Sequence, residues 1–228
     1  MIFEAKNKVQ LVNLNTNLEL SNRSIIAFFE EAGNQVSESE NIGLSSIKTT
    51  KKSWIVLNMK LEVIKRPKYN EEVIIKTWIR DISRAFCFRD YELYSTNNEL
   101  LAKATAKWIY YDLEKGRIVN LKEISHTTNI DETRKVEIQI SEKEKVESIK
   151  NSFEYKVISK DIDFNNHMHN LEYFSLAEEA IKYEPKKIEV EFKSEAKLGD
   201  VLTVERNNNS IIISNGDKIN ANIKIEED

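Results

Sequence analysis

The sequence predicts an α+β fold built from one unit that occurs twice, each unit being a long helix wrapped by a curved antiparallel β-sheet. Apolar residues recur at helical spacing in two stretches, 25–36 and 173–181. Alternating, strand-like runs follow both stretches. The helices superpose when Glu178-Glu179-Ala180 is laid on Glu30-Glu31-Ala32. Because one such unit leaves a sheet face uncovered, two units are expected to pair and bury it.

The first half of the chain reads as a strand, a helix and four strands. Residues of one parity predict the first strand: Phe3, Ala5, Val9 and Leu11. Ser21 is a good N-cap for the helix, whose apolar face carries Ile25, Phe28, Phe29, Ala32 and Val36. The next strand, 54–64, alternates strictly at Ile55, Leu57, Met59, Leu61 and Val63, and it stops at Pro67. Three further strands are expected at 73–79, 85–94 and 100–111.

The second half repeats this order. An alternating run at 153–157 is followed by a polar cluster, the second helix, and strands expected at 188–192, 201–205, 211–214 and 219–225. Asn215-Gly216 suits a hairpin turn. Residues 126–150 are polar and highly charged, with some helical tendency at 141–145. We therefore expect an N-terminal domain at 1–125, a charged connection at 126–150 and a C-terminal domain at 151–228.

Composition excludes several classes of protein. The 228 residues are 40% apolar and 32% charged, which is typical of a globular protein. A net charge of −4 argues against a nucleic-acid binder. No apolar run approaches the roughly 18 residues of a membrane helix, and the N-terminus lacks the pattern of a secretory signal. With a single cysteine, no internal disulfide forms, and a cytoplasmic location is expected.

A dense polar cluster stands at the entrance to the second helix. Residues 161–170 include two aspartates, three asparagines and two of the chain's three histidines. A helix N-terminus offers unpaired backbone N–H groups and a partial positive charge, so a carbonyl oxygen can be polarised there. Helix capping accounts for one or two of these side chains. The remainder favour a functional site.

In its motifs and their order, the chain resembles the acyl-carrier-protein thioesterases of plants and bacteria, which are double-hotdog chains. The resemblance covers nearly the whole sequence. In the first half it rests on Ser53-Trp54-Ile-Val-Leu, Lys65-Arg66-Pro67, Thr77-Trp78, Phe88-Arg89-Asp90-Tyr91 and Ala106-Lys107-Trp108. In the second half it rests on residues 161–170 and on Val190-Glu-Phe-Lys-Ser-Glu195-Ala196.

The resemblance implies a double hotdog fold and hydrolysis of fatty acyl-acyl-carrier-protein to free fatty acid in bacterial fatty acid biosynthesis. It implies catalytic roles for Asp163, Asn165, His167 and Glu195. No cofactor is implied, because 4′-phosphopantetheine arrives with the substrate. Two departures stand out. Met168-His169-Asn170 replaces the usual Val-Asn-Asn, which leaves the role of His169 open, and Ala196 replaces the cysteine of plant members, which argues against a thiol nucleophile.

These side chains suit thioester hydrolysis. Glu195 is the expected general base for water, and Asn165 would position that water or donate to the thioester oxygen. His167 would donate to the oxyanion or protonate the leaving thiolate, and Asp163 would orient Asn165 or His167. Backbone N–H groups at the helix entrance are expected to complete the oxyanion site. Direct attack by the carboxylate, giving an anhydride, is the alternative mechanism.

Glu195 poses a difficulty, because it shares parity with Glu189 and Glu191 on the polar side of its strand. A bulge or turn would be needed to re-aim it. Overlaying the halves sets Asn17 on Asn165, Glu19 on His167 and Pro67 opposite Glu195. The first half therefore lacks the histidine and the acid. We expect one active site per chain, with the first half supplying the acyl pocket.

Other notable residues receive simpler interpretations. Cys87, between two phenylalanines, is expected to be an apolar filler. His126 is expected in a solvated loop, and the three histidines lack metal-ligand spacing. The pocket wall could include one or more of Trp54, Trp78 and Trp108.

Two other functions remain open: an acyl-coenzyme A thioesterase, and a non-catalytic acyl-binding protein. The expected partner is an acidic acyl-carrier protein, which needs a local basic patch for docking. Three clusters offer one: Lys48, Lys51 and Lys52; Lys65, Arg66 and Lys68; and Arg80 with Arg84. The second cluster is favoured because it flanks Pro67. No nucleic-acid or membrane partner is expected, and a homodimer is left open.

Overall fold

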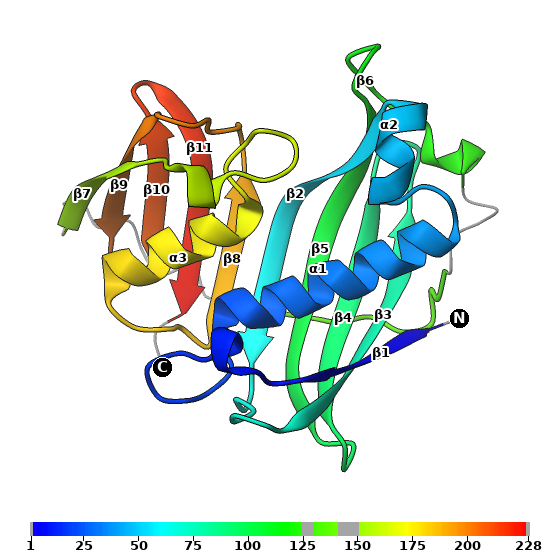
Figure 1. Cartoon of the computed structure of the whole chain (residues 1–228), viewed down its shortest axis with the longest axis horizontal. Coiled ribbons are helices and arrows are strands. Elements are labelled where there is room, and N and C mark those ends of the chain that lie inside the picture. The colour runs from blue at the N-terminus through cyan, green and yellow to red at the C-terminus, as the bar shows by residue number, and fades with distance from the viewer. Residues whose placement is uncertain (1, 125–129, 141–150, 227–228) are drawn as a thin grey trace. The chain divides into compact units, whose positions relative to one another are not determined.

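The computed structural model describes residues 2–124, 130–140 and 151–226. The chain forms two compact units, unit 1 comprising residues 1–138 and unit 2 residues 139–228 (Figure 1). The expected connection at 126–150 runs across this division. His126 and the expected helical tendency at 141–145 lie outside the described residues.

Unit 1 contains one antiparallel sheet. Its strands are β1 (Phe3–Lys8), β2 (Lys52–Val63), β3 (Glu72–Ile82), β4 (Cys87–Ser95), β5 (Leu100–Asp112) and β6 (Arg117–Ile118). They pair in the order β1-β3-β4-β5-β2, with β6 added to β5. The strands expected from alternation are confirmed, except that the first ends at Lys8. Its expected extension to Leu11 was wrong, because Leu11 lies in an exposed 3₁₀ turn. The short β6 was not expected.

Helix α1 (Asn22–Ser39) crosses one face of this sheet (Figure 1). The Ser21 hydroxyl caps it by accepting from Ser24 N at 3.1 Å, as expected. Its buried face includes Ile25, Ile26, Phe29, Ala32 and Val36. Phe29 stacks on Tyr91 of β4 with ring centroids 5.2 Å apart. Gly33 permits this close approach, because a Cβ there would lie 3.2 Å from the Tyr91 hydroxyl oxygen.

A β-bulge interrupts the expected alternation of β2. The register with β5 shifts between Val56 and Asn58, so Leu57 has no paired partner there. The buried side chains are consequently Val56, Met59, Leu61 and Val63, whereas Ile55 and Leu57 are only partly buried. The prediction of strict alternation over the whole strand was therefore wrong at its N-terminal end. One extra residue reverses the facing of every side chain beyond it.

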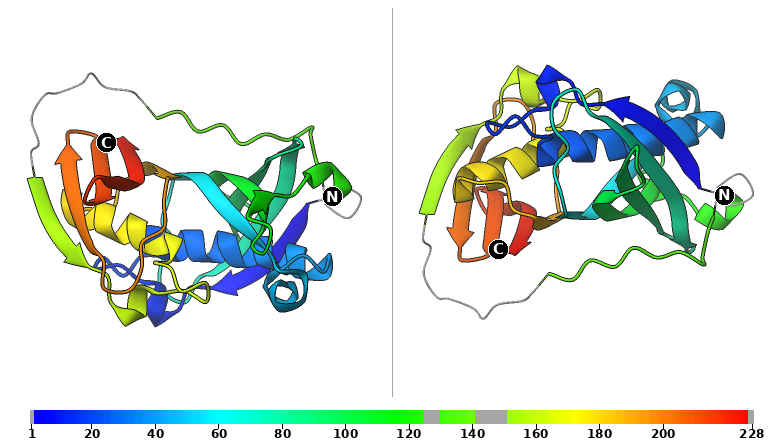
Figure 2. Two further views of the ribbon diagram at one scale, coloured as in Figure 1. Left: turned by 90° about the horizontal axis from the view of Figure 1, so that it is seen from above. Right: turned by 90° about the horizontal axis from the view of Figure 1, so that it is seen from below.

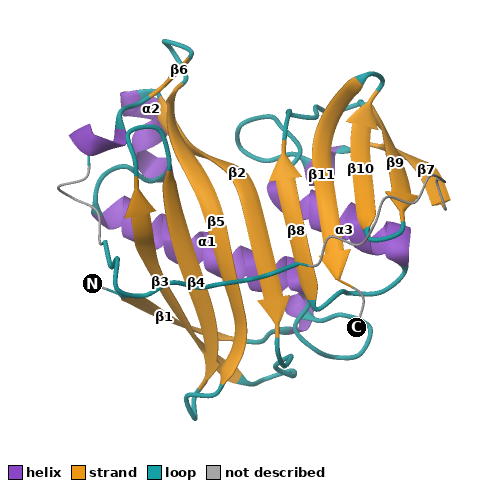
Figure 3. Ribbon diagram, turned by 180° about the vertical axis from the view of Figure 1, so that it is seen from behind, coloured by secondary structure: helices purple, strands orange, loops and turns teal. Residues whose placement is uncertain are grey.

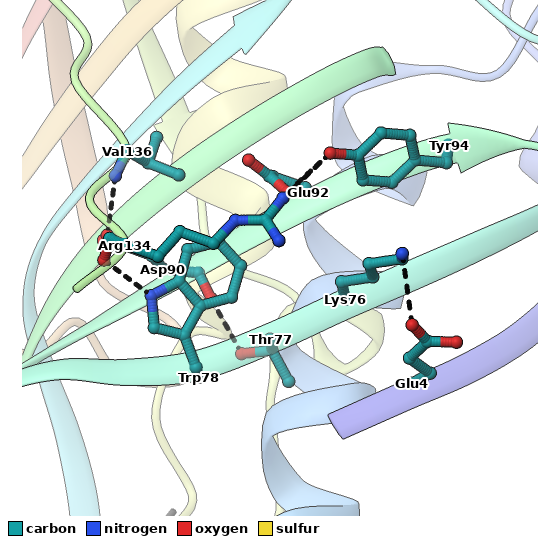
Figure 4. A network of polar contacts seen from close by, with 9 residues as sticks. All are labelled: Glu4, Lys76, Thr77, Trp78, Asp90, Glu92, Tyr94, Arg134 and Val136. Atoms are coloured by element: carbon teal, nitrogen blue, oxygen red, sulfur yellow. Dashed lines mark hydrogen bonds and ion pairs between the residues drawn. The ribbon is translucent and has the colours of Figure 1, made fainter. Parts of the chain in front are cut away.

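Residues 130–138, here called the strap, cross the face of the unit 1 sheet opposite α1 (Figure 3). Val136 N donates to Asp90 Oδ2 at 2.8 Å, and Trp78 Nε1 donates to Arg134 O at 3.0 Å. Arg134 also forms an ion pair with Glu92, as Figure 4 shows. Trp78 therefore lies under the strap, on the face of the sheet opposite α1.

Unit 2 contains antiparallel strands and helix α3 (Asn170–Ile181). Its strands are β7 (Asn151–Lys156), β8 (Lys187–Phe192), β9 (Val201–Asn207), β10 (Ser210–Asn215) and β11 (Lys218–Glu226). They pair antiparallel in the order β8-β11-β10-β9-β7. The expected hairpin at Asn215-Gly216 is confirmed, with Gly216 at φ 59°. Figure 2 shows α3 against one face of these strands.

The expected apolar face of α3 is also confirmed, since Tyr173, Phe174, Ala177, Ala180 and Ile181 are all buried. The described residues also form short helices: α2 (Ile47–Thr50) and four 3₁₀ turns at Leu11–Asn13, Leu44–Ser46, Leu121–Glu123 and Ser159–Asp161. None of the helices in the described ranges is long and apolar enough to cross a membrane.

The two units repeat the same backbone hydrogen bonds before their helices. Asn15 N donates to Glu19 O at 2.8 Å, and Asp163 N donates to His167 O at 2.8 Å. In the same way, Asn17 N donates to Asn15 Oδ1 at 2.9 Å, and Asn165 N donates to Asp163 Oδ1 at 2.8 Å. The overlay of Asn17 on Asn165 and of Glu19 on His167 is therefore confirmed.

The segments after β2 and β8 correspond between the two units, but their alignment is shifted by one residue from the expected overlay. Leu20 N donates to Pro67 O at 2.8 Å, and Met168 N donates to Ala196 O at 2.8 Å. Pro67 is thus the counterpart of Ala196, and Arg66 is the counterpart of Glu195. Placing Pro67 opposite Glu195 was wrong, because the turns that follow align Glu71, not Glu72, with Asp200. Backbone N–H groups of Lys68 and Lys197 bond to those two carboxylates at 2.9 and 2.8 Å.

Leu18 and Asn166 occupy the same left-handed position in the two units, at φ 61° and 63°. Asparagine tolerates this conformation, whereas leucine pays roughly 1–2 kcal/mol for it. Leu18 is also 65% exposed, so burial does not offset the strain. Leu18→Asn should therefore raise the free energy of unfolding by about 1 kcal/mol in urea denaturation. Asn166→Leu is the matched control and should lower it. Equal stability of all three proteins would contradict this account of the turn.

Candidate functional site

Asp163 organises the loop that carries the predicted site residues. Its Oδ1 accepts from Asn165 N at 2.8 Å and from His167 N at 3.2 Å. Its own N–H donates to His167 O at 2.8 Å, and Asn166 takes the left-handed conformation that closes the turn. Asp163 therefore does contact Asn165 and His167, but it does so through their backbone N–H groups. The Asp163 carboxylate therefore fixes the backbone positions from which the Asn165 and His167 side chains project.

Asp161 anchors the same loop from the interior. It is 0% exposed, and its Oδ2 accepts from the Tyr155 hydroxyl at 2.7 Å and from Ile158 N at 2.9 Å. Burial raises the pKa of Tyr155 to about 12, and the hydrogen bond to this carboxylate adds to the shift. The sequence analysis gave Asp161 no individual role. The signal was its position three residues after Ile158, where an aspartate can cap a short turn.

A β-bulge re-aims Glu195. Lys193 N and Ser194 N both donate to Asn220 O, at 2.8 and 3.2 Å, so two residues of one strand face one residue of the next. The parity that grouped Glu195 with Glu189 and Glu191 ends at this point. Past the bulge, Glu195 Oε2 lies 2.9 Å from His167 Nε2. The structure thus resolves the difficulty seen in the sequence and brings these two predicted residues together.

The His167–Glu195 pair stands at the surface of unit 2. The side chains are 28% and 59% exposed, so water reaches the carboxylate directly. Asn165 is half-buried, and within the described part of the chain its side chain makes no hydrogen bond to either member of the pair. Asp163, His167 and Glu195 are therefore linked in series by hydrogen bonds. Asn165 is linked to this series through its backbone N–H, which donates to Asp163 Oδ1.

The helix entrance offers fewer N–H groups than expected. Met168 N is bonded to Ala196 O and His169 N to Asp161 O, each at 2.8 Å. Leu171 N donates to His169 Nδ1 at 3.2 Å, so His169 is the N-cap of α3. These three groups are therefore not available to an oxyanion. The sequence left the role of His169 open, and the structure shows that this residue caps α3.

Unit 1 holds different chemistry at the matching positions. Glu19 replaces His167, and Arg66 replaces Glu195. The Arg66 guanidinium donates to Leu20 O at 2.9 Å and to Asn22 Oδ1 at 2.8 Å, so it stabilises the start of α1. Lys65 is paired with Glu99 at 2.9 Å. Two members of the favoured docking cluster are thus engaged within unit 1, which weakens that cluster as a binding surface.

Cys87 has the environment of a core residue. It is 2% exposed in a cluster with Ile79, Tyr110 and Leu121. Burial raises the pKa of its thiol to about 12. Across the described ranges, no three His, Cys, Asp or Glu side chains gather in a group that could hold a metal ion.

Comparison with known proteins gives concordant results for both halves. A family model described as Acyl-ACP thioesterase N-terminal domain matches residues 1–146, and one described as Acyl-ACP thioesterase C-terminal domain matches residues 142–227. Oleoyl-acyl carrier protein thioesterase 2, chloroplastic, of Arabidopsis thaliana is 23% identical over 180 residues, which are 70% of this chain and 49% of that protein. The chain spans about half the length of the curated relatives it matches.

Solved structures of similar fold cover almost the whole chain. A putative oleoyl thioesterase from Lactobacillus plantarum superposes with a TM-score of 0.82 at 17% identity, covering 99% of this chain and 95% of that one. The 12:0-ACP thioesterase from Umbellularia californica superposes with a TM-score of 0.81 at 16% identity, covering 99% and 96%. At these identities the likeness shows a shared fold.

The raised pKa of Cys87 generates a direct prediction. At pH 8 almost none of this thiol is ionised, and only the thiolate reacts readily. A thiol-reactive dye should therefore leave the native protein unlabelled and label it fully after unfolding in urea. Cys87→Ala should keep the catalytic turnover of the unchanged protein. Rapid stoichiometric labelling of the native protein would show that this cysteine is accessible and ionised.

Proposed function

Because the chain belongs to the acyl-ACP thioesterase family, we propose that it hydrolyses fatty acyl thioesters carried on acyl-carrier protein. The products are a free fatty acid and the carrier with its thiol restored. The observation that carries the proposal is the 2.9 Å contact between His167 Nε2 and Glu195 Oε2 at the surface of unit 2. It joins a base and a proton donor where water and a thioester can both arrive.

We assign each unit one hotdog domain, so that the chain is a double hotdog. The repeated hydrogen bonds before α1 and α3 support this assignment. Unit 2 would hold the chemistry, and unit 1 would supply the acyl pocket beneath α1. The small, buried side chains of Ala102, Ala104 and Ala106 on β5 would form part of its wall.

Glu195 is the proposed general base. His167 Nε2–H donates to one carboxylate oxygen, which leaves the other to accept a proton from water. The water oxygen then bonds to the thioester carbon, and the C–S bond breaks as the tetrahedral intermediate collapses. The proton taken from water passes through the pair to the departing sulfur. Since Glu195 is exposed, direct attack on the carbonyl to form an anhydride is the alternative route.

Asn165 is the proposed donor to the thioester oxygen. The backbone N–H groups of Met168, His169 and Leu171 are already bonded, so a side-chain donor would stabilise the developing oxyanion in their place. The Asn165 amide is such a donor on this loop, whereas the His167 Nε2–H is used on Glu195. Asp163 would serve both by holding their backbone N–H groups, which makes it a positioning residue.

Acyl-coenzyme A as the substrate and a non-catalytic acyl-binding role are the competing functions. We propose that the enzyme works in the cytoplasm without a cofactor, since 4′-phosphopantetheine belongs to the substrate. A homodimer remains compatible with this proposal. Rates measured side by side with the acyl-carrier-protein and coenzyme A thioesters of one fatty acid separate the three functions.

The carrier would dock on a basic cluster of unit 1. Arg80 lies 3.1 Å from the buried Asp90 carboxylate, and Lys65 and Arg66 are engaged as described above. Lys48 within α2 and Lys51 at its C-cap are exposed, with Lys52 partly buried next to them. This cluster is therefore the better candidate for an acidic carrier.

Removing the base should abolish most of the activity. Glu195→Gln keeps the size of the side chain but cannot accept a proton, so turnover should fall about 100-fold or more. The melting temperature should hardly change, because the side chain is mostly exposed. Glu19→Ala, at the position matching His167 in unit 1, is the control and should keep turnover. A Glu195→Gln protein with unchanged turnover would remove Glu195 from the mechanism.

Reversing Lys48 and Lys51 to glutamate should raise KM for acyl-carrier-protein substrate, and the effect should shrink at high salt as screening grows. Hydrolysis of a small uncharged acyl thioester should not change. Lys6→Glu with Lys8→Glu is the matched control, because both lysines are exposed on β1 and the charge change is the same. If the control pair raises KM equally, net charge and not docking at α2 explains the effect.

A further inference from the structure

Asn220 occupies an irregular position in β11. Toward β10 the register jumps from Ile213 opposite Ala221 to Ser214 opposite Ile219, so Asn220 has no paired partner on that side. Toward β8, its carbonyl accepts the two successive N–H groups that form the bulge before Glu195. The Asn220 carbonyl thus forms the bulge that changes the direction of the chain after β8.

The Asn220 side chain reaches the same segment. It is 0% exposed, and its Nδ2 lies 3.1 Å from Glu195 O and 3.3 Å from Ser194 O. Its Oδ1 is buried and has no hydrogen-bond partner among the residues described. Burying an amide oxygen without a hydrogen-bond partner is unfavourable. A residue chosen for stability alone would be apolar here.

Unit 1 makes the same bulge without an amide. Ile64 N and Lys65 N donate to Leu101 O at 2.9 and 3.0 Å. The register between β4 and β5 skips Leu101 as that between β10 and β11 skips Asn220. Leu101 is 3% exposed, so it fills the equivalent buried place. The backbone therefore forms this bulge on its own, and the amide is an addition found in the unit that holds Glu195.

We propose that Asn220 is a positioning residue for Glu195, an inference that rests on the proposed catalytic role of Glu195. Its amide holds the Glu195 carbonyl from one side, while Met168 N holds Ala196 O at 2.8 Å from the other. With the backbone fixed on both sides, the Cβ of Glu195 is held in one place, and only rotation of the side chain can take its carboxylate away from His167. The buried Asn220 amide thus fixes the backbone that carries the exposed Glu195 carboxylate.

The test exchanges the residues that the two units use at this position. Asn220→Leu should fold with a melting temperature close to that of the unchanged protein, because leucine supports the same bulge in unit 1. Its kcat should fall by about 10- to 100-fold, the scale expected when a reacting group is displaced by a fraction of an ångström to 1 Å. KM should change little. Asn220→Gln, which keeps the amide donor, should recover part of kcat, and Leu101→Asn should leave kcat unchanged.

A double-mutant cycle with Glu195→Gln distinguishes positioning from a general structural effect. If Asn220 acts through Glu195, Asn220→Leu should cause no further loss of kcat in the Glu195→Gln protein. Fully additive losses, an unfolded Asn220→Leu protein, or unchanged kcat in Asn220→Leu would each overturn the proposal. If Glu195→Gln alone keeps full turnover, the proposed function of Glu195 fails and this inference fails with it. A slow Glu195→Gln beside a fast Asn220→Leu overturns only the positioning role.

Discussion

Two successive backbone N–H groups bonded to one carbonyl oxygen determine where the acid of this site points. At the end of β8, Lys193 N and Ser194 N share Asn220 O, and the strand loses its regular pleat there. Without this bulge Glu195 would project beside Glu191. With it, the carboxylate meets His167, which the Asp163 turn presents from the other side. Each half of the site thus depends on local backbone geometry, and the buried Asp161 carboxylate anchors the loop of the His167 half.

The same backbone frame occurs in both units with different side chains on it. Glu19 and Arg66 stand where unit 2 has His167 and Glu195, and the Arg66 guanidinium is used on Leu20 O and Asn22 Oδ1. The frame alone therefore does not specify chemistry. What distinguishes unit 2 is a small set of substitutions on a shared set of hydrogen bonds. This is the physical basis for proposing one active site per chain.

Periodicity predicted both helices, most strands and the repeat, because those depend on local burial patterns. The motif at 161–170 located the loop, and its counterpart at 13–22 followed from the helix overlay. The bulge at Leu57 could not be predicted, since it is defined by a partner strand distant in sequence. The bulge at Ser194 was inferred only from the need to re-aim Glu195, and its position depends on the contact with Asn220. The strap over Trp78 and the contacts of Arg66 with the start of α1 also depend on residues distant in sequence, so they could not be predicted. Long-range hydrogen bonds, which leave no local pattern, account for the wrong alignment of Pro67 with Glu195.

The central claim is that Glu195 activates water and never bonds to the acyl group. The most direct measurement is hydrolysis of an acyl thioester in oxygen-18-labelled water over many turnovers, followed by mass spectrometry of the fatty acid and of the peptide that contains Glu195. Water activation predicts one labelled oxygen in each fatty acid and none in the glutamate. Label accumulating in Glu195, with unlabelled acid released in the first turnover, would show an anhydride intermediate and contradict the claim.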